Sequence, residues 1–191
     1  GTAGFHEVAA EIFDDALKTD NRRFLSVEAL ARFPVLCLDG APAPGPFPGG
    51  ADLLRMALDP RDRDRPDLRG VIEAEVLPLA EAGPGSLRGV RCVVLVDPPA
   101  ISESLARDLA EFVRAGGGLL VTLGPRSSPE ALNERGYAGG SGLLPARVLG
   151  LKGDPADREK SVRLRGSVYE HPALLPFNDP GRGNQGAVRV H

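Results

Sequence analysis

The sequence predicts an α/β fold with a mostly parallel central sheet, and two observations carry that prediction. The first is the unit over residues 90–126, where an apolar run ends at Asp97, an amphipathic segment follows, and Gly116-Gly117-Gly118 precedes a second apolar run. The second is the apolar run Val35-Leu36-Cys37-Leu38, which is typical of a strand covered on both faces. Connections this short predict a right-handed parallel crossover.

The composition indicates a globular chain and excludes some classes of function. With 191 residues, 42% hydrophobic and 26% charged, the chain is long enough to bury one substantial core. Its formal net charge of -3 lacks the basic footprint of a general nucleic-acid binder. Aromatic residues make up only 5%, with no Trp, which argues against base-stacking platforms.

The first 31 residues have the pattern of two antiparallel strands. Residues 5–12 and 23–30 alternate approximately, and the turn-forming segment 14–21 lies between them. Because a lone pair of strands is marginal in water, we expect it to complete a sheet of a preceding domain or to pack on the main body. The strand-like start without an initiator Met suggests a segment of a longer chain.

The main body is expected to begin with a strand over 33–40 and a Pro-rich loop over 41–50. A helix over 51–58 follows, in which Leu53, Leu54, Ala57 and Leu58 can share one face. The charged tract 59–67 is typical of a solvated loop. A more alternating strand over 71–77 is expected nearer the edge of the sheet, and 79–87 is expected to hold a short helix or turns.

Next come a buried strand over 91–96 and a helix whose expected N-cap is Ser102. Its apolar face is formed by Leu105, Leu109, Phe112 and Val113, and Gly116 is expected to end it in the left-handed conformation. After the strand at 119–123, a short helix capped by Ser127 or Ser128 is predicted over 128–135, then a flexible loop over 137–142. Short strands are expected at 161–165 and 187–190.

The two cysteines, Cys37 and Cys92, lie inside apolar runs and are interpreted as buried small hydrophobes. No apolar segment approaches the ~20 residues that cross a bilayer, so we expect the chain itself to be soluble, without direct membrane insertion.

Several motifs of the chain together carry a resemblance to a known family: Asp20-Asn21-x-Arg23, Val35-Leu36-Cys37-Leu38-Asp39-Gly40, Val93-Val94-Leu95-Val96-Asp97, the segment 109–120 and Gly142-Leu143-Leu144-Pro145-Ala146. With the order of elements, they resemble the class I glutamine amidotransferase-like domain. More closely, they are similar to the version found in bacterial membrane-anchored proteins with an aerotolerance-regulator (BatA-type) N-terminal region and often a von Willebrand factor A domain.

This resemblance implies a flavodoxin-like three-layer sandwich with a mostly parallel central sheet, preceded by a short antiparallel β segment. It implies that residues 1–31 are the terminal strands of a preceding immunoglobulin-like β module and that residues 32–191 form the amidotransferase-like α/β domain. It further implies a membrane-anchored, extracytoplasmic full-length protein whose other domains are the expected partners.

Amidotransferase chemistry requires a Cys on a strand-to-helix elbow with a His nearby, because the thiolate needs a base. At the matching elbow the chain has Gly124-Pro125-Arg126-Ser127, and Glu170-His171-Pro172 departs from the family's His-x-Glu pair. Serine catalysis by Ser127 or Ser128 with His171 would rest on an incomplete triad, and a helix cap is the commoner role of such a serine. The sequence therefore predicts no catalytic residues.

The candidate ligand edge consists of Asp39, Asp97, Gly124, Arg126 and Ser127. Asp39 and Asp97 each end a central strand, where open α/β sheets bind ligands. The two carboxylates and Arg126 would suit a cation or a polar ligand. The favoured interpretation is that both carboxylates accept hydrogen bonds from loop amides, since no further metal-ligand cluster is visible. We therefore expect no bound metal and no cofactor.

The sequence leads to one preferred function and two alternatives. The preferred function is a non-catalytic amidotransferase-like domain that serves interaction or ligand sensing within a larger membrane-anchored bacterial protein. The first alternative is a hydrolase or transferase with an unrecognised site at the carboxyl edge of the sheet. The second is a scaffold that binds no ligand.

Overall fold

The centre of the fold is a four-stranded sheet in which every strand runs parallel to its neighbours, in the order β4-β3-β5-β6. The computed structural model describes residues 2–12, 21–42, 49–60, 70–153, 157, 161–163, 169–172, 175–179 and 189–190. The strands are β3 (Phe33–Asp39), β4 (Ile72–Pro78), β5 (Cys92–Val96) and β6 (Gly118–Thr122). This arrangement confirms the predicted α/β class, and β4 lies at an edge as expected.

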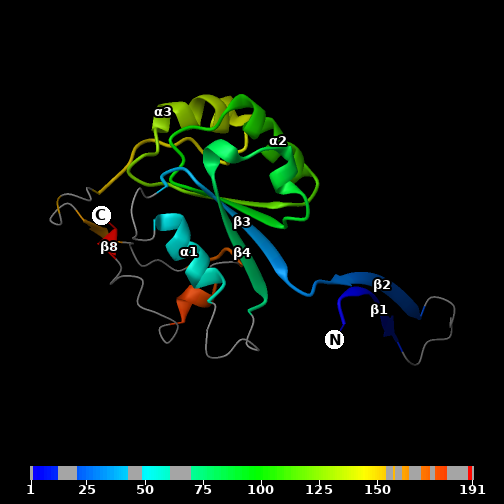
Figure 1. Cartoon of the computed structure of the whole chain (residues 1–191). Coiled ribbons are helices and arrows are strands. Elements are labelled where there is room, and N and C mark those ends of the chain that lie inside the picture. The colour runs from blue at the N-terminus through cyan, green and yellow to red at the C-terminus, as the bar shows by residue number, and fades with distance from the viewer. Residues whose placement is uncertain are drawn as a thin grey trace.

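Helices cover both faces of this sheet, which gives the predicted three layers. Helix α1 (Gly50–Leu58) lies on one face, and α2 (Glu103–Arg114) and α3 (Pro129–Leu132) lie on the other (Figure 1). Alternate residues of β3 divide between the two cores: Val35 and Cys37 face α1, whereas Leu36 and Leu38 pack with α2. Because both faces are covered, β3 has a continuous apolar sequence.

The two cores lie on opposite faces of the sheet. The core beside α2 is formed by Leu36, Leu38, Val93, Leu95, Ile101, Leu105, Leu109, Leu132 and Leu144. The core beside α1 is formed by Val35, Cys37, Ala51, Ala74, Val94 and Val96.

The direction in which the chain winds reverses between β3 and β5. From β3 the chain continues through α1 to β4 on one side, and from β5 it continues through α2 to β6 on the other. The loops that leave β3 and β5 therefore diverge at the carboxyl edge of the sheet. Such a switch point is where open α/β sheets bind ligands.

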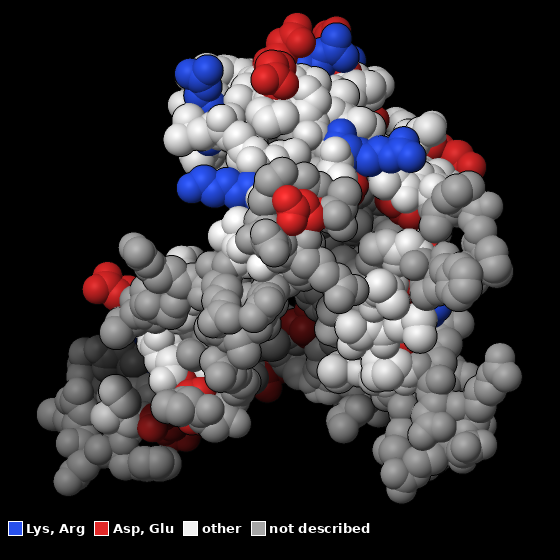
Figure 2. Space-filling view, turned by 90° about the vertical axis from the view of Figure 1, so that its left-hand side faces the viewer, with Lys and Arg blue, Asp and Glu red and all other residues white. Residues whose placement is uncertain are grey.

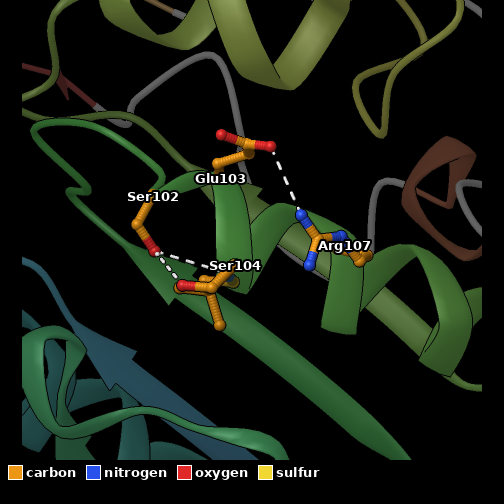
Figure 3. A network of polar contacts seen from close by, with 5 residues as sticks. Ser102, Glu103, Ser104 and Arg107 are labelled. Atoms are coloured by element: carbon orange, nitrogen blue, oxygen red, sulfur yellow. Dashed lines mark hydrogen bonds and ion pairs between the residues drawn. The ribbon is translucent and has the colours of Figure 1, made fainter.

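The first turn of α2 is fixed by its own side chains (Figure 3). The Oγ of Ser102 accepts a hydrogen bond from the backbone N–H of Leu105 at 3.2 Å, which confirms Ser102 as the N-cap. The Oγ atoms of Ser102 and Ser104 lie 3.2 Å apart, and Glu103 and Arg107 form an exposed ion pair at 3.3 Å. These contacts hold the start of α2 beside the switch point.

Two helix predictions need refinement. Gly116 follows α2 with φ of 98°, which confirms the left-handed stop. Leu53 and Ala57 were expected on the buried face of α1, but Leu53 is 56% exposed and Ala57 is also exposed, because the face that packs against the core is formed by Ala51, Leu54 and Leu58. In α2, Val113 is likewise 39% exposed, since it lies at the margin of the apolar face.

The segment 137–142, expected to be a flexible loop, contains regular turns. After α3 the chain forms a π-helical turn, Asn133–Tyr137, and a 3-10 turn, Ala138–Gly140. The N–H of Gly142 donates to the carbonyl of Tyr137 at 3.0 Å, and a Cβ at position 142 would lie 2.1 Å from the carbonyl oxygen of Gly136. The missing side chain of Gly142 therefore permits this close backbone approach.

Strands β1 (Gly4–Glu11) and β2 (Arg22–Ala29) form a separate antiparallel hairpin, as predicted. Figure 1 shows that it projects away from the parallel sheet. Its large apolar residues are exposed to solvent, with Phe5 78% and Leu25 63% exposed. An ion pair between Glu28 and Arg91 links the hairpin to the main body.

Two short strands near the C-terminus, β7 (Val162–Arg163) and β8 (Arg189–Val190), pair in antiparallel fashion. The predicted strands 161–165 and 187–190 lie partly outside the described residues, as do most of the predicted loops 14–21, 41–50 and 59–67. None of the helices in the described ranges is long and apolar enough to cross a bilayer.

Candidate functional site

Asp97 occupies an unusual backbone position at the end of β5. Its φ is 46°, in the left-handed region that residues with side chains seldom adopt. The end of β3 lies close to the end of β5, and the N–H of Gly40 donates to the carbonyl of Val96 at 2.8 Å. A Cβ at position 40 would lie 2.3 Å from the carbonyl oxygen of Asp97, so only glycine fits here without displacement.

The carboxylate of Asp97 holds the turn that follows β6. Both of its oxygens lie within hydrogen-bond distance of the N–H of Arg126, Oδ1 at 3.0 Å and Oδ2 at 3.2 Å. The Oδ1 atom also accepts the N–H and the hydroxyl of Ser127, each at 2.9 Å. This confirms the prediction that Asp97 accepts hydrogen bonds from loop amides, and it ties the ends of β5 and β6 together.

Ser127 is part of the same turn. It is only 5% exposed, and its Oγ accepts the N–H of Gly124 at 3.2 Å while donating to Asp97. No hydrogen bond joins Ser127 to a histidine in the described part of the chain. The hydroxyl is therefore engaged on both sides by structural contacts.

Gly124 and Arg126 contribute backbone rather than side chains to this turn. A Cβ at position 124 would lie 2.6 Å from Cγ of Asp97, so glycine makes room for the carboxylate. Arg126 donates its backbone N–H to Asp97, while the residue itself is exposed. We call the set Asp97, Gly124, Arg126 and Ser127 the Asp97 turn. It brings together four of the five residues of the predicted ligand edge.

Asp39, the fifth predicted residue, lies at the end of β3 and does not hydrogen-bond to the Asp97 turn in the described part of the chain. It is 5% exposed, and Oδ1 accepts the N–H of Ala41 at 2.9 Å, as predicted for a loop amide. Asp39 also lines a cleft at the switch point.

The switch-point cleft has a volume of about 540 Å³. Its polar lining residues are Asp39, Ser102, Ser104 and Arg135, the last from the π-helical turn. Its apolar wall is made by Pro42, Pro78, Leu79, Ala80, Ala82, Pro99, Ala100, Ile101 and Leu105. A site with one negative group, one positive group and an apolar wall suits a small polar molecule.

Three of these polar residues were not predicted as site residues. Ser102 was assigned only a capping role, and Ser104 and Arg135 carried no recognisable motif. The available signal was the position of Ser102 and Ser104 directly after β5, at the switch point. Arg135 gave no signal, because it reaches the cleft only through the packing of the segment after α3.

Among the described residues no group of three His, Cys, Asp or Glu side chains is placed to hold a metal ion. Both cysteines are free thiols, and Cys37 is fully buried beneath α1. Burial raises the pKa of the Cys37 thiol, nearby Cys92 raises it further, and Arg55 partly opposes this. The pKa of the Cys92 thiol is also raised by burial.

Charged side chains of both signs are interleaved on the face shown in Figure 2, without a large area of one sign among the described residues. Comparison of the chain with protein-family models, with curated proteins and with solved structures found no match.

Proposed function

We propose that this chain is a non-catalytic, amidotransferase-like α/β domain that senses a small polar ligand within a larger membrane-anchored bacterial protein. The observation that carries the proposal is the switch-point cleft. It lies at the end of β3, and the largely buried Asp39 is one of its lining residues.

Three features of the cleft support ligand sensing. Its volume of about 540 Å³ lies within the range of small-molecule sites. Its position is the one at which open α/β sheets take their ligands. Its two charged groups, Asp39 and Arg135, have opposite signs. Molecules that carry both a cationic and an anionic group therefore match it better than molecules with a single charge.

The hydrogen bonds of the Asp97 turn support a non-catalytic role. A serine nucleophile needs a base within hydrogen-bond reach and an exposed Oγ. Ser127 is 5% exposed, and its hydroxyl donates to Asp97, whose carboxylate also accepts two backbone N–H groups of the turn. The alternative of a hydrolase or transferase at this edge would require Ser127 to leave these partners and meet a base.

Membrane anchoring is proposed from the family resemblance, and the other domains of the full-length protein are the proposed partners. An antibody raised against this domain tests the location. In fractionated cells of the source bacterium, we expect the reactive protein in the membrane fraction and released by detergent. Recovery in the fraction without membranes would contradict this part of the proposal.

A thermal-shift screen tests ligand sensing directly. The probes are the twenty amino acids, small dicarboxylates, nucleoside monophosphates and the chlorides of Mg²⁺, Ca²⁺ and Zn²⁺. A ligand that binds only the native state raises the melting temperature, because it stabilises that state. At a ligand concentration of a hundred times its Kd, the added free energy of unfolding is about 2.7 kcal/mol. We expect zwitterionic probes to give the largest increase. If no probe raises the melting temperature, the proposal that this domain senses a ligand of these classes is wrong.

A further inference from the structure

The geometry points to a second interaction surface: we propose that two copies of this chain associate through the outer edge of β2. The two β2 strands pair in antiparallel fashion about a two-fold axis at Leu25, which produces a four-stranded sheet in the order β1-β2-β2-β1. This proposal does not depend on the switch-point cleft.

The first support is the open edge of β2. In the described part of the chain, β1 and β2 form a sheet of only two strands, so the outer edge of each strand has no strand beside it. A hairpin of two strands is marginal in water, and three or more strands with an apolar face are needed for independent stability. Unpaired edges of this kind are templates for pairing with another chain.

The second support is the charge pattern, which selects β2 over β1. In β2 the basic residue Arg22 and the acidic residue Glu28 lie near opposite ends of the strand. Antiparallel pairing around Leu25 places Arg22 of one copy opposite Glu28 of the other, twice in each dimer. The ionic residues of β1, Glu7 and Glu11, carry only negative charge, so β1 offers no such match.

Arg22 and Glu28 can each make this contact in addition to the ion pair that it already forms. Arg22 is 59% exposed and already pairs with Glu11, and Glu28 is 40% exposed and pairs with Arg91. A guanidinium has five N–H donors and a carboxylate has about four acceptor positions, so each retains capacity for a second partner.

The third support is the exposed apolar surface of the hairpin. Val8, Leu25 and Val27 point to one side, as the register of β1 and β2 requires, and are 51%, 63% and 40% exposed. Phe5 and Phe24 point to the other side and are 78% and 58% exposed. Pairing around Leu25 keeps each side continuous across both copies, and the match of Arg22 with Glu28 selects this register.

The antiparallel arrangement also separates the two main bodies. The hairpin projects away from the parallel sheet, and β2 leads into the main body at its Ala29 end (Figure 1). In the dimer, the two Ala29 ends lie at opposite ends of the four-stranded sheet. The bodies are therefore held apart while the edges pair.

Sedimentation velocity on the 191-residue chain tests the proposal with a matched pair of variants. We expect the wild-type chain to shift from monomer to dimer as concentration increases. Leu25→Lys places two like charges at the two-fold axis and should give a monomer. Val8→Lys puts the same substitution opposite Leu25 on the same face but on β1, away from the copy. It should still dimerise.

Disulfide trapping provides a second measurement that does not rely on the folding of the Lys variants. In Leu25→Cys the two thiols face each other across the axis and should crosslink under mild oxidation. In Val27→Cys they lie four residues apart along the strand, about 13 Å, and should not crosslink. A wild-type chain that stays monomeric at every concentration would overturn the proposal and favour strands of another β module as the occupant. Equal crosslinking of both Cys variants would overturn the register.

Discussion

The carboxylate of Asp97 accepts hydrogen bonds from both the backbone N–H and the hydroxyl of Ser127, each at 2.9 Å. This relationship joins the loop after β5 to the loop after β6 at the carboxyl edge of the sheet. The hydroxyl of Ser127 is therefore part of the hydrogen bonding that stabilises this edge.

Replacement of Ser127 by Ala should destabilise the fold. The change leaves the N–H of Gly124 without its acceptor and removes one donor to Asp97 in a buried position, so we expect a loss of about 1–3 kcal/mol in the free energy of unfolding. Chemical denaturation measures it. Ser141→Ala, which removes an exposed hydroxyl bonded to the carbonyl of Ala138, should lose much less. Equal losses would contradict the role of Ser127.

Gly124→Ala should weaken the same edge through steric overlap. The added Cβ would lie 2.6 Å from Cγ of Asp97, so either the carboxylate or the turn must move, at a cost of about 1–3 kcal/mol. Gly150→Ala is the matched control, because its Cβ would meet no atom within 4 Å. Thermal melting of the two variants compares them. A Gly124→Ala variant as stable as the control would show that the close approach is not needed.

Leu109 tests the packing of α2 on the sheet. Its side chain is fully buried between α2 and the strands, so Leu109→Ala should cost about 2–5 kcal/mol through lost burial and the cavity left behind. Leu149, which is 92% exposed, should tolerate the same substitution with almost no change. Urea denaturation of both variants gives the comparison. A small effect at Leu109 would mean that α2 does not pack as described.

Stability should fall at alkaline pH because of Cys37. Burial favours the neutral thiol and raises its pKa in the folded state. The resulting stabilisation is fully present below the ordinary thiol pKa and is lost as pH rises from there through the raised folded value. The free energy of unfolding of Cys37→Ala should therefore depend less on pH in the alkaline range than that of the wild type. Parallel curves for the two proteins would contradict this.

The sequence was sufficient to predict the elements that depend on local patterns. The continuous apolar run of β3 reflects burial on both faces, Ser102 caps α2, and Gly116 ends it with a positive φ. These features follow from periodicity and backbone chemistry within a few residues. The hydrogen bonds of Asp39 and Asp97 were also predictable, since a carboxylate at a strand end commonly accepts from loop amides.

The rest of the site depends on tertiary packing. The left-handed backbone of Asp97 is set by its approach to Gly40 and Gly124, which are distant in the sequence. Arg135 reaches the cleft from a π-helical turn that the sequence pattern does not indicate. Leu53 has an apolar side chain on the exposed side of α1, so helical periodicity alone assigned it to the wrong face.

The measurement that tests the proposed function most directly is the melting-temperature shift given by the zwitterionic amino acids with four proteins. These are the wild type, Asp39→Asn, Arg135→Gln and the control Arg126→Gln, whose backbone N–H to Asp97 is retained. Asn at position 39 keeps an acceptor for Ala41 but loses the charge in the cleft. The wild type and Arg126→Gln should show equal shifts, and the two cleft variants should show little or none. Equal shifts in all four proteins would contradict binding at the switch-point cleft.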